Sequence, residues 1–255
     1  MKSYAYFLMD SFYRNYLIER HSFFVEQSTR RLLGQFENIE MESKLLSDEW
    51  LDSVGLNFDP DRHDPSDFLE KANDLEIEYH QLLVEMQNMT RLNIISGMFH
   101  LWEKSIRDWI AKEVLHWHRG YFVNKQIWSI KFEDLMGFLS DLGWRVREES
   151  FFIALDQCRQ VVNVYKHGEG SSFEQLTNSD PQFFKSVAFD EYTKTTPTYS
   201  ELTVTDEHID IFSAAITEFW KAIPAEVRGS DNFELPRWFE NAFNKDLILK
   251  SDGGI

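Results

Sequence analysis

The chain has 255 residues, of which 43% are hydrophobic and 15% aromatic; this is enough to bury a sizeable core and excludes general disorder. Its 11 glycines and 6 prolines are few for a loop-rich β protein, so the composition favours an all-α fold. The formal charge of −17 argues against a generic nucleic-acid binder, since such domains are usually basic. Only residues 91–167 depart from this balance, with a net charge of +2.

Cysteine usage and hydropathy exclude several classes of protein. The single cysteine, Cys158, cannot form an internal disulfide or a cysteine-based zinc site, and its apolar neighbours predict a buried, inert thiol. The first residues lack the basic region and apolar run of a secretory signal. No stretch approaches the roughly 18 apolar residues of a membrane span. We therefore expect a cytoplasmic protein with no membrane partner.

The N-terminal part of the chain is acidic and reads as two helices. An aromatic-rich stretch without turn residues predicts a first helix within residues 3–33. Residues 41–54 predict a short second helix, closed by Gly55. Two prolines and alternating acids predict a loop over residues 59–67. We therefore expect residues 1–65 to form an acidic helical extension.

Two amphipathic registers follow one another after this loop. The first has apolar residues at steps of three and four: Ala72, Leu75, Tyr79, Leu82, Met86 and Met89. The second has the same spacing: Leu92, Ile95, Phe99, Trp102, Ile106 and Trp109. Ser66 or Asp67 can cap the first register. The step of three between the registers fits either one helix of some 50 residues with a local irregularity or two helices. Because such lengths are rare in globular domains, we expect a break or bend near Asn88–Arg91.

Most of the remaining chain also has helical periodicity. Helices are expected over residues 131–142, 149–167, 205–223 and 234–250, with Thr205 as a cap and Pro224 as a stop. Between them, residues 168–204 are rich in Ser, Thr, Asn, Asp and Pro and predict a partly irregular insertion. The prediction is an antiparallel helical bundle over residues 66–255 with the acidic extension added to it.

Common catalytic and metal-binding patterns are absent or incomplete. The acidic loop at residues 59–67 lacks the glycine that a calcium loop needs for its tight turn, so a solvated loop is the better interpretation. Glu113 and His116 have the spacing of one half of a di-iron site, but no second Glu-x-x-His exists. There is no nucleophile elbow and no phosphate-binding glycine loop. We therefore expect no metal and no cofactor.

The predicted helix at residues 149–167 carries the one candidate site. Arg159, Asn163 and His167 follow one another at intervals of four, and so share one face of a helix within roughly 80°. A guanidinium, an amide and an imidazole in this order suit phosphate binding and proton transfer. The same residues also fit a solvated helix edge, with His167 at the C-terminus beside Gly168. Both interpretations stay open on this pattern alone.

Two segments, VVNVYKHG at Val161–Gly168 and SGMFHLWEKSIRDWI at Ser96–Ile110, resemble the HEPN superfamily of helical bundles. The resemblance covers about residues 66–223. It implies a HEPN-like bundle that forms a homodimer, in which two helices from two protomers make a composite cleft. Active members of that family are metal-independent ribonucleases, often toxins or antiphage effectors. RNA is then the implied substrate, and an antitoxin or another protein is an implied partner.

Within the resemblance, His167 matches the histidine of the family motif and Asn163 matches its polar residue. The family arginine lies immediately before that polar residue, where this chain has Val162. The nearest arginine upstream is Arg159, one helical turn back from Asn163. The resemblance therefore implies that Arg159 binds phosphate, that His167 is the acid–base group, and that Asn163 orients it, or that the displaced arginine marks a non-catalytic member.

Three further residues are candidates for substrate binding: Lys166, Arg107 and Glu103. Lys166 precedes His167, whereas Glu103 and Arg107 have the spacing of a helix ion pair, which is most simply a surface pair. The first functional hypothesis is thus a HEPN-like endoribonuclease acting in stress response, as a toxin or in phage defence. The alternative is a non-catalytic helical binding or assembly module that uses the same polar face for a protein or nucleotide partner.

Overall fold

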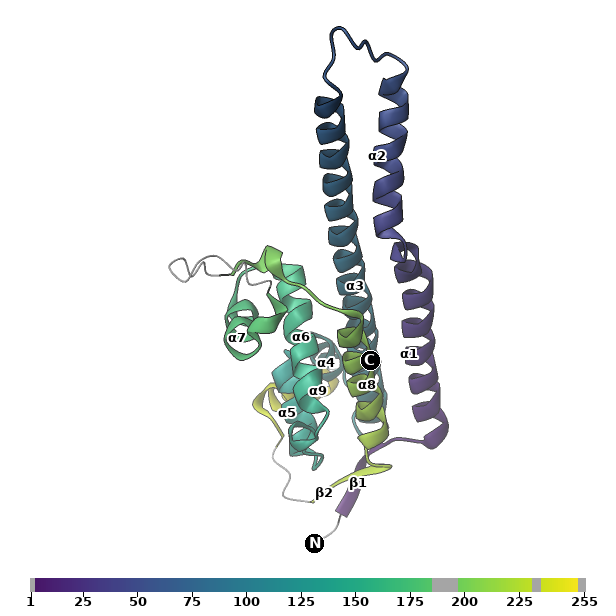
Figure 1. Ribbon diagram of the computed structural model, residues 1–255. Helices are drawn as coiled ribbons and strands as arrows, with labels where there is room; N and C mark the ends of the chain where they lie inside the picture. The colour runs from purple at the N-terminus through teal and green to yellow at the C-terminus, as the bar shows by residue number, and fades with distance from the viewer. Residues whose placement is uncertain (1–2, 185–196, 231–234, 252–255) are drawn as a thin grey trace.

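The protein is all-α, as the composition predicts, with one small antiparallel pair of strands (Figure 1). The computed structural model describes residues 3–184, 197–230 and 235–251. The helices are α1 Ser11–Leu32, α2 Ile39–Gly55, α3 Pro65–Trp117, α4 Tyr121–Ser129, α5 Phe132–Asp141, α6 Phe152–His167, α7 Ser171–Ser179, α8 Asp206–Ala222 and α9 Arg237–Ser251. The strands are β1 Ser3–Leu8 and β2 Glu226–Ser230. Short 3₁₀ helices occupy Leu33–Phe36, Val146–Glu148, Pro181–Phe183 and Tyr199–Glu201.

A single helix of 53 residues, α3, runs through the whole molecule (Figure 1). Its cap is Asp64, whose Oδ1 accepts from the Ser66 N–H at 2.9 Å, and Pro65 occupies the first helical position, where a missing N–H costs nothing. The cap predicted at Ser66 or Asp67 therefore lies two or three residues too late. Despite its length, neither α3 nor any other helix in the described ranges has an apolar run that could span a membrane.

Of the break or bend expected near Asn88–Arg91, the break is wrong, because α3 continues as one helix through this segment. The step of three between the two apolar registers marks a change of neighbours instead. Asn88 donates its Nδ2–H to the Leu202 carbonyl at 2.9 Å and accepts from the Val204 N–H at 3.0 Å. Arg91 pairs with Asp206 of α8 at 2.6 Å. These side chains tie the segment before α8 to the helix and leave the α3 backbone bonds intact.

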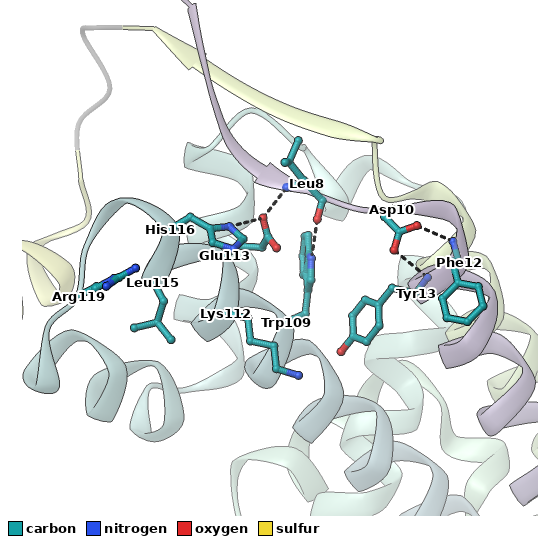
Figure 2. A pocket seen from close by; sticks show the side chains of 10 residues that line it. All are labelled: Leu8, Asp10, Phe12, Tyr13, Trp109, Lys112, Glu113, Leu115, His116 and Arg119. Atoms are coloured by element: carbon teal, nitrogen blue, oxygen red, sulfur yellow. Dashed lines mark hydrogen bonds and ion pairs between the residues drawn. The ribbon is translucent and has the colours of Figure 1, made fainter.

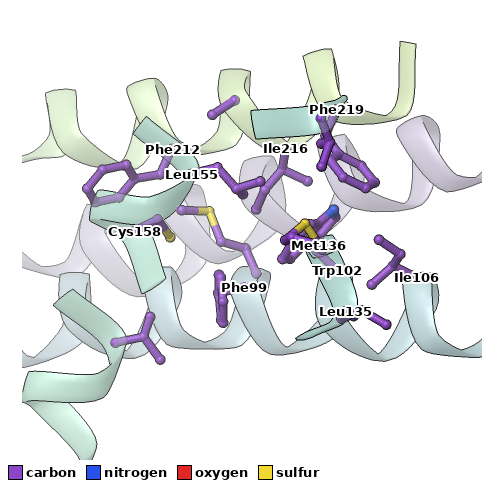
Figure 3. Packing of buried hydrophobic residues seen from close by; sticks show 14 of the residues in the cluster. Phe99, Trp102, Ile106, Leu135, Met136, Leu155, Cys158, Phe212, Ile216 and Phe219 are labelled. Carbon is purple, nitrogen blue, oxygen red and sulfur yellow. The ribbon is translucent and has the colours of Figure 1, made fainter. Parts of the chain in front are cut away.

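The hydrophobic core surrounds the second half of α3 (Figure 3). Helices α1, α6 and α8 pack on this half, and α5 closes the core from the side of Trp102 and Ile106. Trp102 meets Phe219 of α8 edge to face, with ring centroids 5.0 Å apart. The packing places the face of α6 that carries Leu155 and Cys158 inside the core. The polar face of α6 is therefore turned away from the core, and the candidate site lies on this polar face.

The first half of α3 pairs with α2 to form a two-helix arm that projects beyond the bundle (Figure 1). We define the arm as residues 39–90. Ser47 Oγ donates to the Ala72 carbonyl at 2.9 Å, and the rings of Trp50 and Phe68 lie 6.2 Å apart near the tip. Much of the arm surface is apolar; its exposed large hydrophobic side chains are Met41, Leu45, Leu46, Leu56, Leu69, Ile77, Leu82, Met86 and Met89.

The prediction of one helix over residues 3–33 is wrong at its start, because Ser3–Leu8 form β1. This strand pairs antiparallel with β2, in a register from Ser3 opposite Ser230 to Leu8 opposite Glu226. A short apolar run such as YAYFL does not distinguish strand from helix by periodicity. The helix itself begins at Ser11, after the cap Asp10.

Other predicted elements agree more closely with the structure. The second helix, the helix at 131–142, the helix before Gly168, the helix after Thr205 and the last helix are confirmed within a few residues, whereas α4 and β2 were not predicted. The insertion at 168–204 contains α7 and two 3₁₀ turns, and its residues 185–196 lie outside the described part. The domain boundary at residue 65 stays a prediction.

Candidate functional site

The candidate site begins with Arg159, which projects from α6 toward the start of α5. Its Nε donates to Asp156 Oδ1 at 2.8 Å, and its Nη1 lies 3.2 Å from Glu133 Oε1. The guanidinium also stacks over the Phe132 ring, 5.3 Å from the centroid. Only 13% of the side chain is exposed. Two carboxylates therefore already neutralise the cation that was expected to hold phosphate.

Arg159 lines a groove of about 760 Å³ between α5, α6 and α7. The rings of Phe132 and Phe152 stack 6.3 Å apart in its wall. Arg147 borders the groove and donates to the Glu133 carbonyl at 2.8 Å. Gln160 is nearly buried; its Nε2 donates to Asp156 at 2.7 Å, whereas its Oε1 has no hydrogen-bond partner in the described structure. The groove is thus polar, and its two carboxylates, those of Glu133 and Asp156, are already paired with Arg159.

The other two residues of the predicted triad do not converge on this groove. Asn163 Nδ2 donates to Ser172 Oγ of α7 at 3.2 Å. His167 is the last residue of α6, is exposed, and has no side-chain hydrogen bond or ion pair with the described residues. It lies eight positions after Arg159, about 12 Å along the helix axis. Within one protomer, the three side chains therefore share a helix face but not a site.

Lys166 and His100 come together at the C-terminal end of α6. Lys166 is exposed, and Tyr165 beside it donates its hydroxyl to Asn93 Oδ1 of α3 at 3.0 Å. Burial lowers the pKa of His100; the Glu103 carboxylate opposes this shift, and the charges of Lys166 and Lys104 add to it. The neutral form of the His100 imidazole is therefore favoured.

Arg107 and Glu103 form the predicted ion pair, with 2.6 Å between Nη2 and Oε1, but it is not a surface pair. The Arg107 side chain is nearly buried, and it donates to the carbonyl oxygens of Ile127 at 2.7 Å and Ile130 at 3.1 Å. These carbonyls belong to the end of α4 and the turn after it, so Arg107 satisfies a helix C-terminus. Neither residue lines the groove at Arg159.

The buried thiol of Cys158 and the acidic and histidine side chains of the described residues do not form a further reactive group at this site. Cys158 is fully buried, as predicted, and burial raises the pKa of its thiol. Over the residues that the structure describes, no group of three or more His, Cys, Asp and Glu side chains is placed to hold a metal ion. Glu113 instead accepts from the Leu8 N–H at 2.8 Å, and His116 lies 3.6 Å from the same carboxylate.

A second pocket, which was not predicted from the sequence, lies where β1 and the first turn of α1 meet the end of α3 (Figure 2). Trp109, Lys112 and His116 lie on one side of α3 at intervals of three and four, which is a signal visible in the sequence. Tyr13 could not be assigned to the same site from the sequence, because it belongs to the predicted first helix and lies almost one hundred residues away.

Comparisons of this chain with protein-family models, with curated proteins and with solved structures each find no match. The resemblance to the HEPN superfamily therefore depends only on the segments at Ser96–Ile110 and Val161–Gly168.

Proposed function

We propose that the chain is a non-catalytic helical module that binds a basic, amphipathic protein segment along its arm. One observation carries the proposal: Leu82, Met86 and Met89, at steps of four and three on one side of α3, are 56%, 58% and 54% exposed. Soluble proteins rarely leave contiguous large apolar side chains in water unless a partner covers them. Methionine side chains are flexible and polarizable, and suit surfaces that adapt to a partner.

The charge of the arm supports a basic partner. Residues 39–90 contain 14 aspartates and glutamates against 3 lysines and arginines, a net charge of −11 out of −17 for the whole chain. Such a surface attracts a cationic segment and speeds its association. The same charge repels RNA and disfavours the pairing of two arms from two copies of the chain. The apolar stripe and the acids around it therefore favour an amphipathic segment with lysines or arginines on its polar side.

The apolar stripe leads to the polar end of α6. Asn93 lies one helical turn after Met89, and it accepts a hydrogen bond from Tyr165 at 3.0 Å. The exposed Lys166 and His167 follow Tyr165 directly. A segment bound along the stripe can therefore extend to the residues that the sequence analysis selected, where they act as binding groups without any catalytic role.

Two matched peptides test the proposal. One is a helical leucine–lysine repeat and the other is its leucine–glutamate counterpart, each labelled for fluorescence anisotropy. We expect the protein to bind the basic peptide only, and Met86→Gln/Met89→Gln to weaken this binding about tenfold or more. The control is Ile153→Gln/Ile211→Gln, which removes two exposed apolar side chains outside the arm. Equal binding of both peptides, or unchanged affinity in the arm variant, contradicts the proposal.

A metal-independent ribonuclease of HEPN type is the second candidate, and one observation favours it: Arg159 lines a groove large enough for a nucleotide. In this proposal a homodimer brings His167 of one copy toward Arg159 of the other, since the two are far apart within one copy. The test is incubation with cellular RNA in EDTA, beside a His167→Ala variant. Cleavage by the wild type alone supports the ribonuclease and contradicts the binding module. Intact RNA with both folded proteins removes the ribonuclease.

A further inference from the structure

The pocket of about 740 Å³ beside β1 has walls that are fixed by hydrogen bonds (Figure 2). Trp109 Nε1 donates to the Leu8 carbonyl at 3.0 Å, and the Leu8 N–H donates to Glu113 at 2.8 Å. Asp10 caps α1 by accepting from the Phe12 N–H at 2.8 Å. Both carboxylates of the wall are thus occupied by backbone N–H groups. The pocket is preformed, and its size lies in the range of small-molecule sites.

Apolar and aromatic side chains make up one part of this wall. Leu8, Phe12 and Leu115 are all exposed large hydrophobic residues, and all three line the pocket. Phe12, in the first turn of α1, is 80% exposed. Tyr13 stands beside it with its ring facing α3. These side chains offer flat apolar surfaces to a ring.

Besides Asp10, Glu113 and His116, the polar side chains in the lining are two cations and a phenol, those of Lys112, Arg119 and Tyr13. Lys112 lies 5.7 Å from the centroid of the Tyr13 ring and 2.6 Å from Asp108, and the hydrogen bond to Asp108 raises its pKa. Burial raises the pKa of Tyr13, and Lys112 only partly opposes it. Arg119, also in the lining, has no hydrogen bond or ion pair with any residue that the structure describes. At neutral pH the pocket therefore presents an ammonium, a guanidinium and a phenol hydroxyl.

We propose that this pocket binds a small aromatic anion, with its ring against Phe12 and Tyr13 and its anionic group toward Lys112 and Arg119. The two requirements come from different observations: the exposed apolar residues select a planar body, whereas Arg119 and the ammonium N–H groups of Lys112 that Asp108 does not use select its charge. A nucleoside monophosphate and an aromatic carboxylate both have this chemistry. The site lies at the opposite end of α3 from the tip of the arm and does not depend on the proposed protein partner (Figure 1).

Calorimetric titrations with four probes test the ring and the charge separately. The probes are adenosine monophosphate, adenosine, indole-3-acetate and inorganic phosphate. We expect at least one of the two aromatic anions to bind, and both adenosine and inorganic phosphate to bind at least about tenfold more weakly. Which aromatic anion binds more tightly distinguishes a phosphate ligand from a carboxylate ligand. Phosphate binding as tightly as the aromatic anions overturns the proposal, and so does the absence of binding by both aromatic anions.

Charge-removing variants locate the binding. Lys112→Gln/Arg119→Gln is expected to weaken binding of the aromatic anion at least about tenfold. Arg62→Gln/Lys71→Gln removes the same number of charges from the arm and should leave the affinity for the anion unchanged. Phe12→Ser changes only an exposed ring and is expected to weaken binding several-fold with an unchanged melting temperature. Full affinity in the pocket variants overturns the proposal. Met86→Gln/Met89→Gln should retain the anion, so a failure of the arm proposal is distinguishable from a failure here.

Discussion

The two halves of α3 are one continuous helix in very different surroundings. Before Leu92, Ala72 is its only buried residue, whereas thirteen residues between Leu92 and Val114 are buried. The second half lies inside the bundle, in contact with α1, α6 and α8. The first half packs on α2 and exposes its apolar stripe at Leu82, Met86 and Met89. The same periodicity therefore builds a core in one half and a free surface in the other.

This difference shows that amphipathic periodicity does not by itself reveal what covers the apolar face. A helix in water gains most of its stability from packing of that face, so the first half of α3 depends strongly on its packing with α2. The arm also has the higher density of acidic residues, 14 among 52 residues against 29 among the other 203, and these acids repel one another in the folded state. We infer that the arm opens locally at a lower free energy than the bundle, and that a partner on the stripe would supply the missing burial.

The largest expected effect comes from a paired truncation in the two halves. Trp102→Ala removes a ring that is buried in the core and packed on Phe219, so we expect a loss of about 3–5 kcal/mol in the free energy of unfolding. Leu82→Ala removes an exposed side chain of the arm and should change the free energy of unfolding by less than about 0.5 kcal/mol. Urea unfolding followed by circular dichroism measures both. Similar losses for the two variants would mean that the stripe is already buried in solution.

Most helices could be predicted from the sequence because their apolar faces are local patterns. The stripe of α6, its stop at Gly168 with φ at +70°, and the cap at Thr205 all depend on neighbours within a few residues. The strand β1 could not be predicted, since its partner β2 lies more than 200 residues away. The continuity of α3 was missed for a different reason: the step of three after Met89 fits both one helix and two, and the rarity of helices of 53 residues favoured a break.

The candidate site could be predicted less well than the fold. The helix geometry of Arg159, Asn163 and His167 follows from their spacing, but the carboxylate of Glu133 that pairs with Arg159 comes from another helix. The spacing of Glu103 and Arg107 likewise predicted their ion pair but not its burial. Arg107 is covered by the end of α4, where it donates to the Ile127 carbonyl. The direction of a side chain along its helix is a local property. Its charge partners are set by tertiary contacts, and these decide what the side chain can bind.

A smaller effect is expected at Asp246, a buried carboxylate of the bundle; no acidic side chain in the described part of the arm is buried. It is 2% exposed and accepts from the N–H groups of Phe122 and Val123 and from His118. Asp246→Asn leaves part of this set unsatisfied and should lower the free energy of unfolding by about 1–3 kcal/mol. Asp52→Asn, an exposed acid of α2, is the matched control and should be close to neutral. An equal decrease in the free energy of unfolding for Asp52→Asn would contradict a specific stabilising role of Asp246.

The contribution of Asp246 to the free energy of unfolding should decrease at low pH. Burial acts to raise the pKa of Asp246, but the hydrogen bonds from His118, Phe122 and Val123 outweigh it and lower the pKa below its ordinary 3.8. A lowered pKa in the folded state means that the contribution is fully present above that ordinary value and is lost as the pH falls through the folded pKa. Unfolding free energies from pH 7 to pH 3 should therefore show a constant difference between wild type and Asp246→Asn that narrows below about pH 4. A difference that grows on acidification contradicts the assignment.

The smallest expected effect locates the boundary between the two halves of α3. Asn88→Ala removes both hydrogen bonds to the backbone of Leu202 and Val204, which should cost about 1 kcal/mol. If these bonds end the bundle and begin the arm, hydrogen exchange should become faster in residues 199–206 and stay unchanged in α2. Thr90→Ala is the matched control, because its hydroxyl bonds only within α3, to the Met86 carbonyl at 2.8 Å. Faster exchange throughout the arm would instead place the boundary nearer the tip and make Asn88 part of what holds the arm together.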